Sequence, residues 1–130
     1  MAQELSIRID LDSDIPAYRQ IVNTLRVLLV CGRLAPGTEL PSVRHMATDL
    51  GVHFNTVAEA YRMLADEGWL DLRHGKGATV VKRDPPPPSE EQREAFRRRL
   101  QELVAEMIAN GTPPEKVGPE MMKAFGELYS

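Results

Sequence analysis

Three side chains near the middle of the chain carry groups that bind nucleic acid. Arg44 lies at the predicted start of one helix, and Asn55 and Thr56 lie at the predicted start of the next. An arginine in a first helical turn can donate to a phosphate or to a guanine edge. Amides at a helix N-terminus favour phosphate, and an asparagine can pair with adenine. The alternatives are that Arg44 pairs with Asp49 or with water, and that Asn55 and Thr56 only cap their helix.

A second group of such side chains lies in a glycine-rich segment: Arg73, His74, Gly75, Lys76 and Gly77. Apolar residues at 69–72 and 78–81 flank this segment and predict a β-hairpin with the glycines at its turn. Cations on a backbone with glycines, which carry no side chains, can approach the minor groove of DNA. The alternative is an ordinary solvated hairpin turn.

The overall charge argues against indiscriminate binding of nucleic acid. The formal net charge is −3, whereas neutralising phosphates requires an excess of Lys and Arg. Between residues 42 and 83 the cations are Arg44, Arg62, Arg73, Lys76, Lys82 and Arg83, and the acids are Asp49, Glu59, Asp66, Glu67 and Asp71. Placement can still favour DNA locally. The acidic balance keeps open an alternative, in which the chain is a protein-interaction module without a DNA role.

Helical periodicity and turn residues predict the elements that position these side chains. Apolar residues at helical spacing predict a helix over 16–31, a second that is capped by Ser42 and ends before Gly51, and a third that begins near 53–55. Alternation of apolar and polar residues over 5–10 predicts a short strand. Two helices joined by a glycine-containing turn and followed by a hairpin form a winged helix-turn-helix, whose second helix enters the major groove.

A run of prolines at 85–88 favours a stiff polyproline II segment and marks a boundary. We therefore predict a winged helix-turn-helix DNA-binding domain at 1–84, a proline linker at 85–88 and a helical tail at 89–130. In the tail, Ser89 and Gln92 have the spacing of a capping box, and Gly118-Pro119 predicts a break or kink in a second helix. The predicted fold class is α+β and mainly helical.

One side of the first tail helix is apolar at a coiled-coil-like spacing. The residues concerned are Phe96, Leu100, Leu103, Val104, Met107 and Ile108. Two short helices alone make a poor core, so we predict that this side pairs two copies of the chain. The alternative is that the tail packs against the winged domain of its own chain.

The joint spacing from Ile15 to Val81 resembles the DNA-binding domain of GntR-family regulators. The residues that carry the resemblance are Gly32-Arg33-Leu34, Pro36-Gly37, Leu40-Pro41-Ser42-Val43-Arg44, Gly51-Val52, Asn55-Thr56-Val57, Ala60-Tyr61, Leu64, Glu67-Gly68, Arg73 and Gly75-Lys76-Gly77. The Asn-Thr-Val-x-x-Ala-Tyr form and the short tail look like the YtrA subfamily. Its members are dimeric repressors, often of transporter operons. The resemblance thus implies a repressor that binds a palindromic double-stranded operator as a homodimer.

The resemblance also implies a set of DNA contacts: Ser42, Arg44, His53, Asn55, Thr56, Arg62, Arg73, His74, Gly75, Lys76 and Gly77. In the family the tip of the hairpin enters the minor groove, and His74 matches a position used for this in some members.

The sequence departs from the family pattern within the helix-turn-helix. Many members have arginine at the positions of Phe54 and Ala58, and YtrA-like members often have a basic residue at that of Glu59. His45 replaces the glutamate that usually closes the capping box on Ser42. Three placements of Glu59 are open: unpaired in the groove, accepting from cytosine N4, or away from DNA.

The sequence lacks the residue patterns that metal binding or catalysis would require. The three histidines lie on different predicted elements without the spacing of a metal site. The sequence has no nucleophile elbow, phosphate-binding loop or metalloprotease helix, so we expect neither enzyme activity nor a cofactor. The single cysteine, Cys31, fits a reducing compartment. The longest apolar stretch is far short of the roughly 18–20 residues that span a bilayer. We expect a cytoplasmic protein without a membrane partner, and the sequence names no small-molecule effector.

Overall fold

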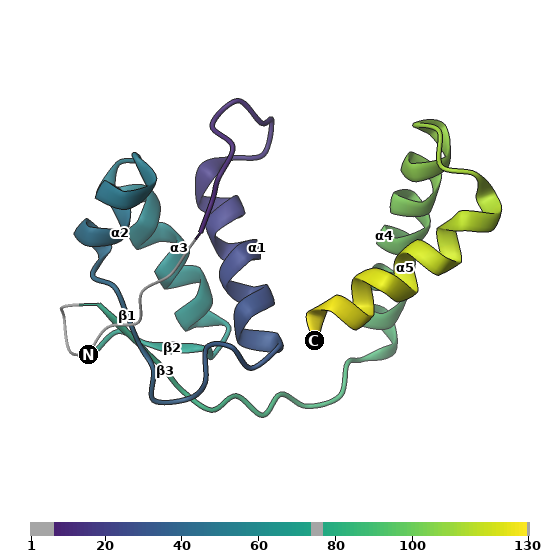
Figure 1. The fold of residues 1–130 in the computed structure, drawn as a ribbon. Coiled ribbons are helices and arrows are strands. Elements are labelled where there is room, and N and C mark those ends of the chain that lie inside the picture. Colours follow the sequence, from purple (N-terminus) through teal and green to yellow (C-terminus); the bar gives the residue numbers. More distant parts are fainter. Residues whose placement is uncertain (1–6, 74–76, 130) are drawn as a thin grey trace. The chain divides into compact units, whose positions relative to one another are not determined.

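The computed structural model describes residues 7–73 and 77–129. It divides into two compact units, of which the first ends at Arg83 and the second begins at Asp84. Figure 1 shows helices on one side of a small sheet in the first unit, and a pair of helices in the second. The assignment of DNA binding to one part and dimerisation to the other stays a prediction.

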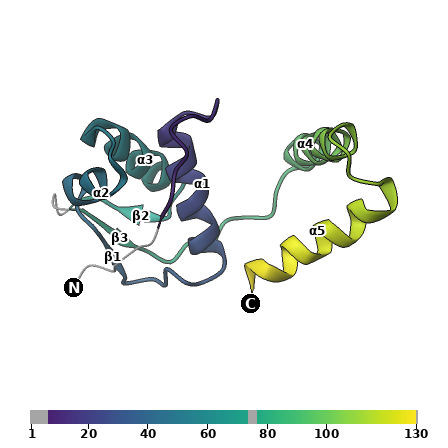
Figure 2. The same cartoon turned by 45° about the horizontal axis from the view of Figure 1, so that its top comes forward.

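Three helices supply most of the core of the first unit. They are α1 (Ala17–Val30), α2 (Val43–Leu50) and α3 (Phe54–Asp66). Helix α3 packs against both α1 and α2, as Figure 2 shows from a second direction. Ile21 and Leu25 of α1 and Val57 and Leu64 of α3 are fully buried. Burial of such an apolar stripe stabilises each helix more than its own propensity does, and the predicted winged-helix fold class is confirmed.

The sheet contains the predicted hairpin and one strand that the sequence did not predict. Strands β1 (Glu39–Leu40), β2 (Leu70–Asp71) and β3 (Ala78–Val80) are antiparallel in the order β1-β3-β2. Leu40 lies opposite Ala78, and Leu70 lies opposite Val80. All four of these side chains are buried. A strand as short as β1, which ends at a proline, has no alternation from which to predict it. We call β2, β3 and the residues around them, 69–81, the wing.

The strand predicted near the N-terminus is wrong for the part that the structure describes. Residues 7–10 form no strand, although Ile7 and Ile9 pack against the core while Arg8 and Asp10 are exposed. The Gln20 side chain takes the place of a neighbouring strand: it accepts from the Asp10 N–H at 2.7 Å and donates to the Asp10 carbonyl at 2.8 Å. The alternation therefore marked one-sided burial of an extended segment.

The tail consists of α4 (Glu90–Ala109) and α5 (Pro114–Leu128). Both bonds of the predicted capping box are present: the Ser89 N–H donates to Gln92 Oε1 at 2.9 Å, and the Gln92 N–H donates to Ser89 Oγ at 3.1 Å. Of the predicted break or kink, the break is wrong, because α5 continues through Pro119, and the kink stays a prediction. Across the described residues, no helix has both the length and the apolar character to cross a membrane.

Candidate nucleic-acid interface

The turn between α2 and α3 depends on a glycine. Gly51 has φ 71° and ψ 34°, a left-handed conformation that a side chain would strain. The Val52 N–H donates to the Ala47 carbonyl at 3.0 Å, which closes the end of α2. The chain therefore leaves α2 and enters α3 within a few residues, as a helix-turn-helix requires.

The start of α2 places Arg44 beside α3. Ser42 Oγ accepts from the His45 N–H at 3.1 Å, so Ser42 is the cap that the sequence predicted. The His45 side chain lies 3.3 Å from Asp49. The Arg44 guanidinium instead lies over the ring of Phe54, 4.7 Å from its centroid. Thus a cation–π contact, rather than an ion pair with Asp49, holds Arg44.

The N-terminus of α3 is capped by a histidine. His53 Nδ1 accepts from the Asn55 N–H at 3.1 Å, so the alternative that Asn55 or Thr56 caps the helix is wrong. Asn55 stands exposed in the first turn, and Thr56 is half-buried. The exposed amide of Asn55 is consequently available at the surface of that turn.

A buried tyrosine joins the two helices. The Tyr61 hydroxyl, from α3, donates to the Pro41 carbonyl at 2.7 Å, directly before α2. The hydroxyl also lies 3.7 Å from the Met46 sulfur. Burial raises the pKa of Tyr61, which keeps the hydroxyl protonated as a donor. This hydrogen bond fixes the start of α2 against the middle of α3.

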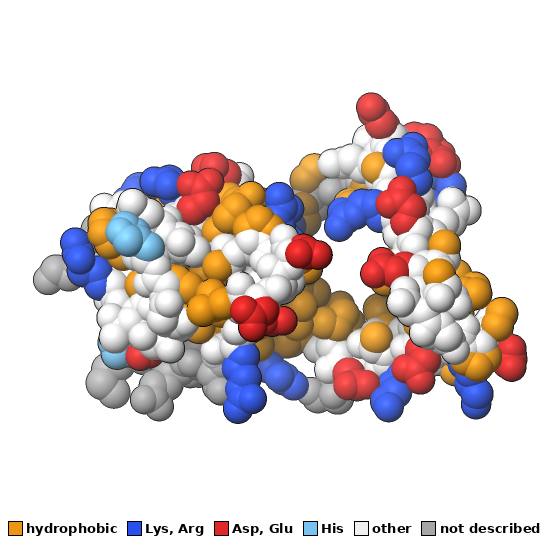
Figure 3. Space-filling view, turned by 90° about the horizontal axis from the view of Figure 1, so that it is seen from above, with side chains coloured by type: hydrophobic (Ala, Val, Ile, Leu, Met, Phe, Trp, Pro, Cys, Tyr) orange, Lys and Arg blue, Asp and Glu red, His pale blue; other side chains and the backbone are white. Residues whose placement is uncertain are grey.

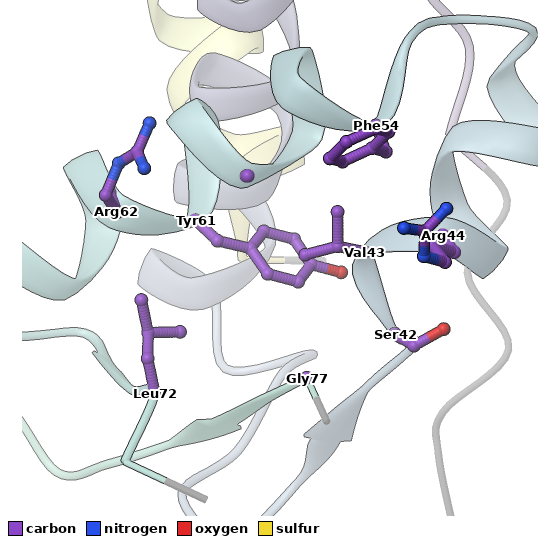
Figure 4. Close-up of a pocket in the computed structure, with 9 residues that line it drawn as sticks. Ser42, Val43, Arg44, Phe54, Tyr61, Arg62, Leu72 and Gly77 are labelled. Carbon is purple, nitrogen blue, oxygen red and sulfur yellow. The ribbon is translucent and has the colours of Figure 1, made fainter. Parts of the chain in front are cut away.

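A groove of about 580 Å³ lies between the start of α2, the outer side of α3 and the wing. We call it the interface groove. It brings together four of the predicted DNA contacts: Ser42, Arg44, Arg62 and Gly77. Its other lining residues are Val43, Phe54, Ala58, Tyr61 and Leu72. In Figure 4, Arg44 and Phe54 lie towards one end, Arg62 and Leu72 towards the other, and Tyr61 lies between them.

The wing approaches the start of α2 at a glycine. A Cβ atom on Gly77 would lie 3.2 Å from the Leu40 carbonyl oxygen and 3.6 Å from Ser42 Cα. Gly77 therefore permits close packing of the wing on this wall of the interface groove, a role that the predicted DNA contact did not include.

Arg73 lies outside the lining of the groove. Its Nη2 is 2.9 Å from Asp71 Oδ2, and its Nε donates to Asp71 Oδ1 at 3.0 Å. The hydrogen bond and charge of Asp71 raise the pKa of Arg73. The predicted contacts His74, Gly75 and Lys76 lie outside the described residues.

Glu59, an acidic residue in the middle of α3, is paired. Arg62 Nη2 lies 2.8 Å from Glu59 Oε2, three residues earlier on the helix. Of the three placements open for Glu59, an unpaired charge in the groove is therefore wrong. Because of this pair, the Glu59 carboxylate lies beside the Arg62 guanidinium wherever Arg62 contacts DNA.

The apolar lining was not predicted as part of the site. Phe54 and Ala58 lie four residues apart on α3 and both border the interface groove. The sequence held the signal, because these are positions at which many GntR-family members have arginine.

In the described part of the chain, no cluster of three or more His, Cys, Asp or Glu side chains is placed to hold a metal ion.

Comparisons with known proteins agree with this geometry. Residues 17–80 match the family described as "Bacterial regulatory proteins, gntR family". The chain is 32% identical to the "HTH-type transcriptional repressor YtrA" of Bacillus subtilis, over 85% of each chain. It is 30% identical to "YtrA from Sulfolobus acidocaldarius, a GntR-family transcription factor", a solved structure, with a TM-score of 0.55 over 93% of this chain and 97% of the other.

A third relative is longer. The "Probable rhizopine catabolism regulatory protein MocR" of Rhizobium meliloti is 43% identical over 59% of this chain, but the match covers only 16% of that protein. The match to it covers little more than half of this chain, whereas the YtrA match, over 111 residues, is longer than the first unit and so extends into the tail. By its family match, its similarity to YtrA and its fold, the chain belongs to the GntR family of bacterial transcription regulators as a YtrA-like member.

Proposed function

We propose that this regulator is a repressor that binds a palindromic DNA operator as a homodimer in the cytoplasm. The observation that carries DNA binding is the interface groove, which gathers Ser42, Arg44 and Arg62 along the exposed side of α3. A helix fits the major groove of B-DNA, which is about 12 Å wide. Helix α3 is the second helix of the motif and is the one that enters it.

The side chains have distinct roles in this arrangement. Arg44 donates to a guanine edge or a phosphate from the first turn of α2. Asn55 is exposed at the start of α3, where its amide pairs with adenine and the backbone amides attract phosphate. The wing contacts the minor groove through its cations, of which Arg73 has to exchange its pairing with Asp71 for phosphate.

The dimer rests on the tail. Phe96 is 53% exposed, and Leu100 and Leu103 are each 49% exposed. Val104 and Met107 are half-buried, and α4 has no buried residue. The face seen in Figure 3 has acidic and basic side chains beside hydrophobic ones on the tail. So large an exposed apolar side supports pairing with the same side of a second copy, which an isologous interface provides.

The likeness to the Bacillus subtilis protein supports the repressor assignment. That protein is named a repressor, and the match covers 85% of each chain. A palindromic operator follows from the dimer, because two related copies of α3 face two related half-sites. The same reasoning applies to any two-fold symmetric member of this fold.

Fluorescence anisotropy tests the proposal. Labelled duplexes from the promoter of the chain's own gene are titrated with the full chain, beside random duplexes of equal length. We expect the promoter duplex to bind at least tenfold more tightly, and Arg44→Ala to remove most of that difference. If promoter and random duplexes bind equally weakly, the chain is instead a protein-interaction module, the function that its net charge of −3 kept open.

A further inference from the structure

The side of α3 that borders the interface groove is unusually apolar. Phe54 and Ala58 lie one helical turn apart, so their side chains occupy the same face. Phe54 is 38% exposed and does not belong to the buried core. A phenylalanine that leaves so much of its ring in water without supporting the core is suited to contact a partner.

The cations nearest to this apolar face are already engaged. Arg62, the next residue along the same face, is held by Glu59 at 2.8 Å. Arg44 lies over the Phe54 ring at 4.7 Å, and the His53 ring is stacked 4.6 Å from that ring. These two neighbours fix the orientation of the Phe54 ring before any ligand arrives, so little side-chain entropy is lost on binding.

An apolar side chain can recognise only one feature of a base-pair edge in the major groove. The polar atoms there are donors and acceptors that a phenyl ring or a methyl group cannot satisfy, whereas the C5-methyl group of thymine is apolar. Burying a polar edge against Phe54 would leave that edge without its hydrogen bonds. The groove therefore favours thymine at the base pairs that meet Phe54 and Ala58.

We propose that Phe54, together with Ala58, determines operator specificity by contacting a thymine C5-methyl group in each half-site. This inference rests on the proposed function, since it requires α3 to lie in the major groove. It adds a specificity-determining residue at a position where the family pattern has a cation, and it gives the operator a defined chemical feature.

Deoxyuridine substitution isolates the methyl group. High-affinity duplexes are first selected from a random pool with the full-length chain. Each thymine is then replaced by deoxyuridine at symmetric positions in both half-sites, which removes the methyl group and keeps the base pair. At one position we expect Kd to rise about fourfold per half-site, the effect of losing one buried methyl group, and thus about fifteenfold for both.

Variants assign the effect to the residue. Phe54→Ala should bind thymine and deoxyuridine duplexes equally at that position. Phe54→Leu keeps an apolar side chain and should retain at least a twofold preference for thymine. Phe125→Ala removes an exposed phenylalanine of the tail and should keep the parental ratio. Because Phe54 lies outside the buried core, its variants should melt near the parental temperature. This measurement checks that they fold.

The outcomes separate the two proposals. If the chain selects no sequence from the pool, the proposed DNA-binding function fails and the inference fails with it. If it selects a sequence but no thymine is sensitive to loss of its methyl group, the inference is overturned while DNA binding stands. The inference is likewise overturned if Phe54→Ala keeps the parental preference for thymine.

Discussion

Replacing Glu59 by glutamine removes a negative charge from the exposed side of α3 and breaks an ion pair. The pair joins Arg62 Nη2 and Glu59 Oε2 at 2.8 Å, and the two side chains are 62% and 49% exposed. An exposed pair at this spacing stabilises a helix by only about 0.2–0.5 kcal/mol. We therefore expect the melting temperature of Glu59→Gln to fall by no more than about 4 °C.

The effect on DNA should be larger and should depend on salt. With Glu59 neutral, Arg62 is free to contact a phosphate. One added phosphate contact steepens the slope of log K against log salt by about 0.9. Over a fourfold rise in salt, from about 50 to 200 mM, that slope corresponds to about 3.5-fold. The variant should bind random DNA more tightly than the parent, and its advantage should shrink by that factor.

Anisotropy with a random duplex at both salt concentrations measures the effect. Glu90→Gln is a matched control, because Arg93 Nη2 and Glu90 Oε2 form an ion pair of 2.7 Å at the same spacing on α4. If Glu59→Gln and Glu90→Gln change random-duplex binding alike, the reasoning about Arg62 is refuted. If Glu59→Gln instead relaxes the preference at one operator base pair and leaves random binding alone, Glu59 accepts from a cytosine.

Three further predictions concern the groove and the tail. Arg44→Ala should weaken binding of the selected duplex by about 1–3 kcal/mol, with a small fall in melting temperature, because its exposed cation–π contact with Phe54 stabilises the fold by about 0.5–1 kcal/mol; equal affinity would place Arg44 away from DNA. Tyr61→Phe leaves the Pro41 carbonyl without its buried donor and should cost about 1–3 kcal/mol of stability. An unchanged midpoint in thermal melting would contradict this prediction. Burial raises the pKa of Tyr61, so the stability that this group contributes is present below its unfolded pKa of about 10 and falls as pH rises above it. The parent should therefore lose more stability than Tyr61→Phe when the pH is raised above about 10. Replacing Leu100 and Leu103 together by Asp places charges in the apolar side of α4; sedimentation should show a monomer, and a persisting dimer with parental affinity would exclude this side as the interface.

Local signals account for the parts of the fold that the sequence predicts. Ser42 and Gly51 bound α2 because a hydroxyl cap and a left-handed residue act on backbone groups within a few positions. The pair of Glu59 and Arg62 has the same local character, since residues three apart on a helix are neighbours. This pair was not predicted, although its spacing alone indicates it.

Contacts between distant residues account for what the sequence did not predict. Tyr61 donates to Pro41 across twenty positions, and Gly77, directly before β3, approaches Leu40 of β1. Neither contact leaves a periodic trace in the sequence, because each depends on how the elements pack. The expected strand fails over 7–10, the part of it that the structure describes, for the same reason: alternation reports one-sided burial, and only the fold decides whether a neighbour strand or the side chain of Gln20 satisfies the backbone.

The paired cations of α3 and the wing connect the weak charge of the protein to the dimer that we propose. Arg62 is paired with Glu59 and Arg73 with Asp71, so each has to exchange a carboxylate for a phosphate before it gains from DNA. A single winged unit therefore obtains little of the counterion release that dominates non-specific affinity. Two units joined through the tail meet the second half-site at a high effective concentration, which raises affinity only for DNA with two correctly spaced half-sites. Thymine contacts by Phe54 then add at both half-sites at once, whereas random DNA offers neither advantage.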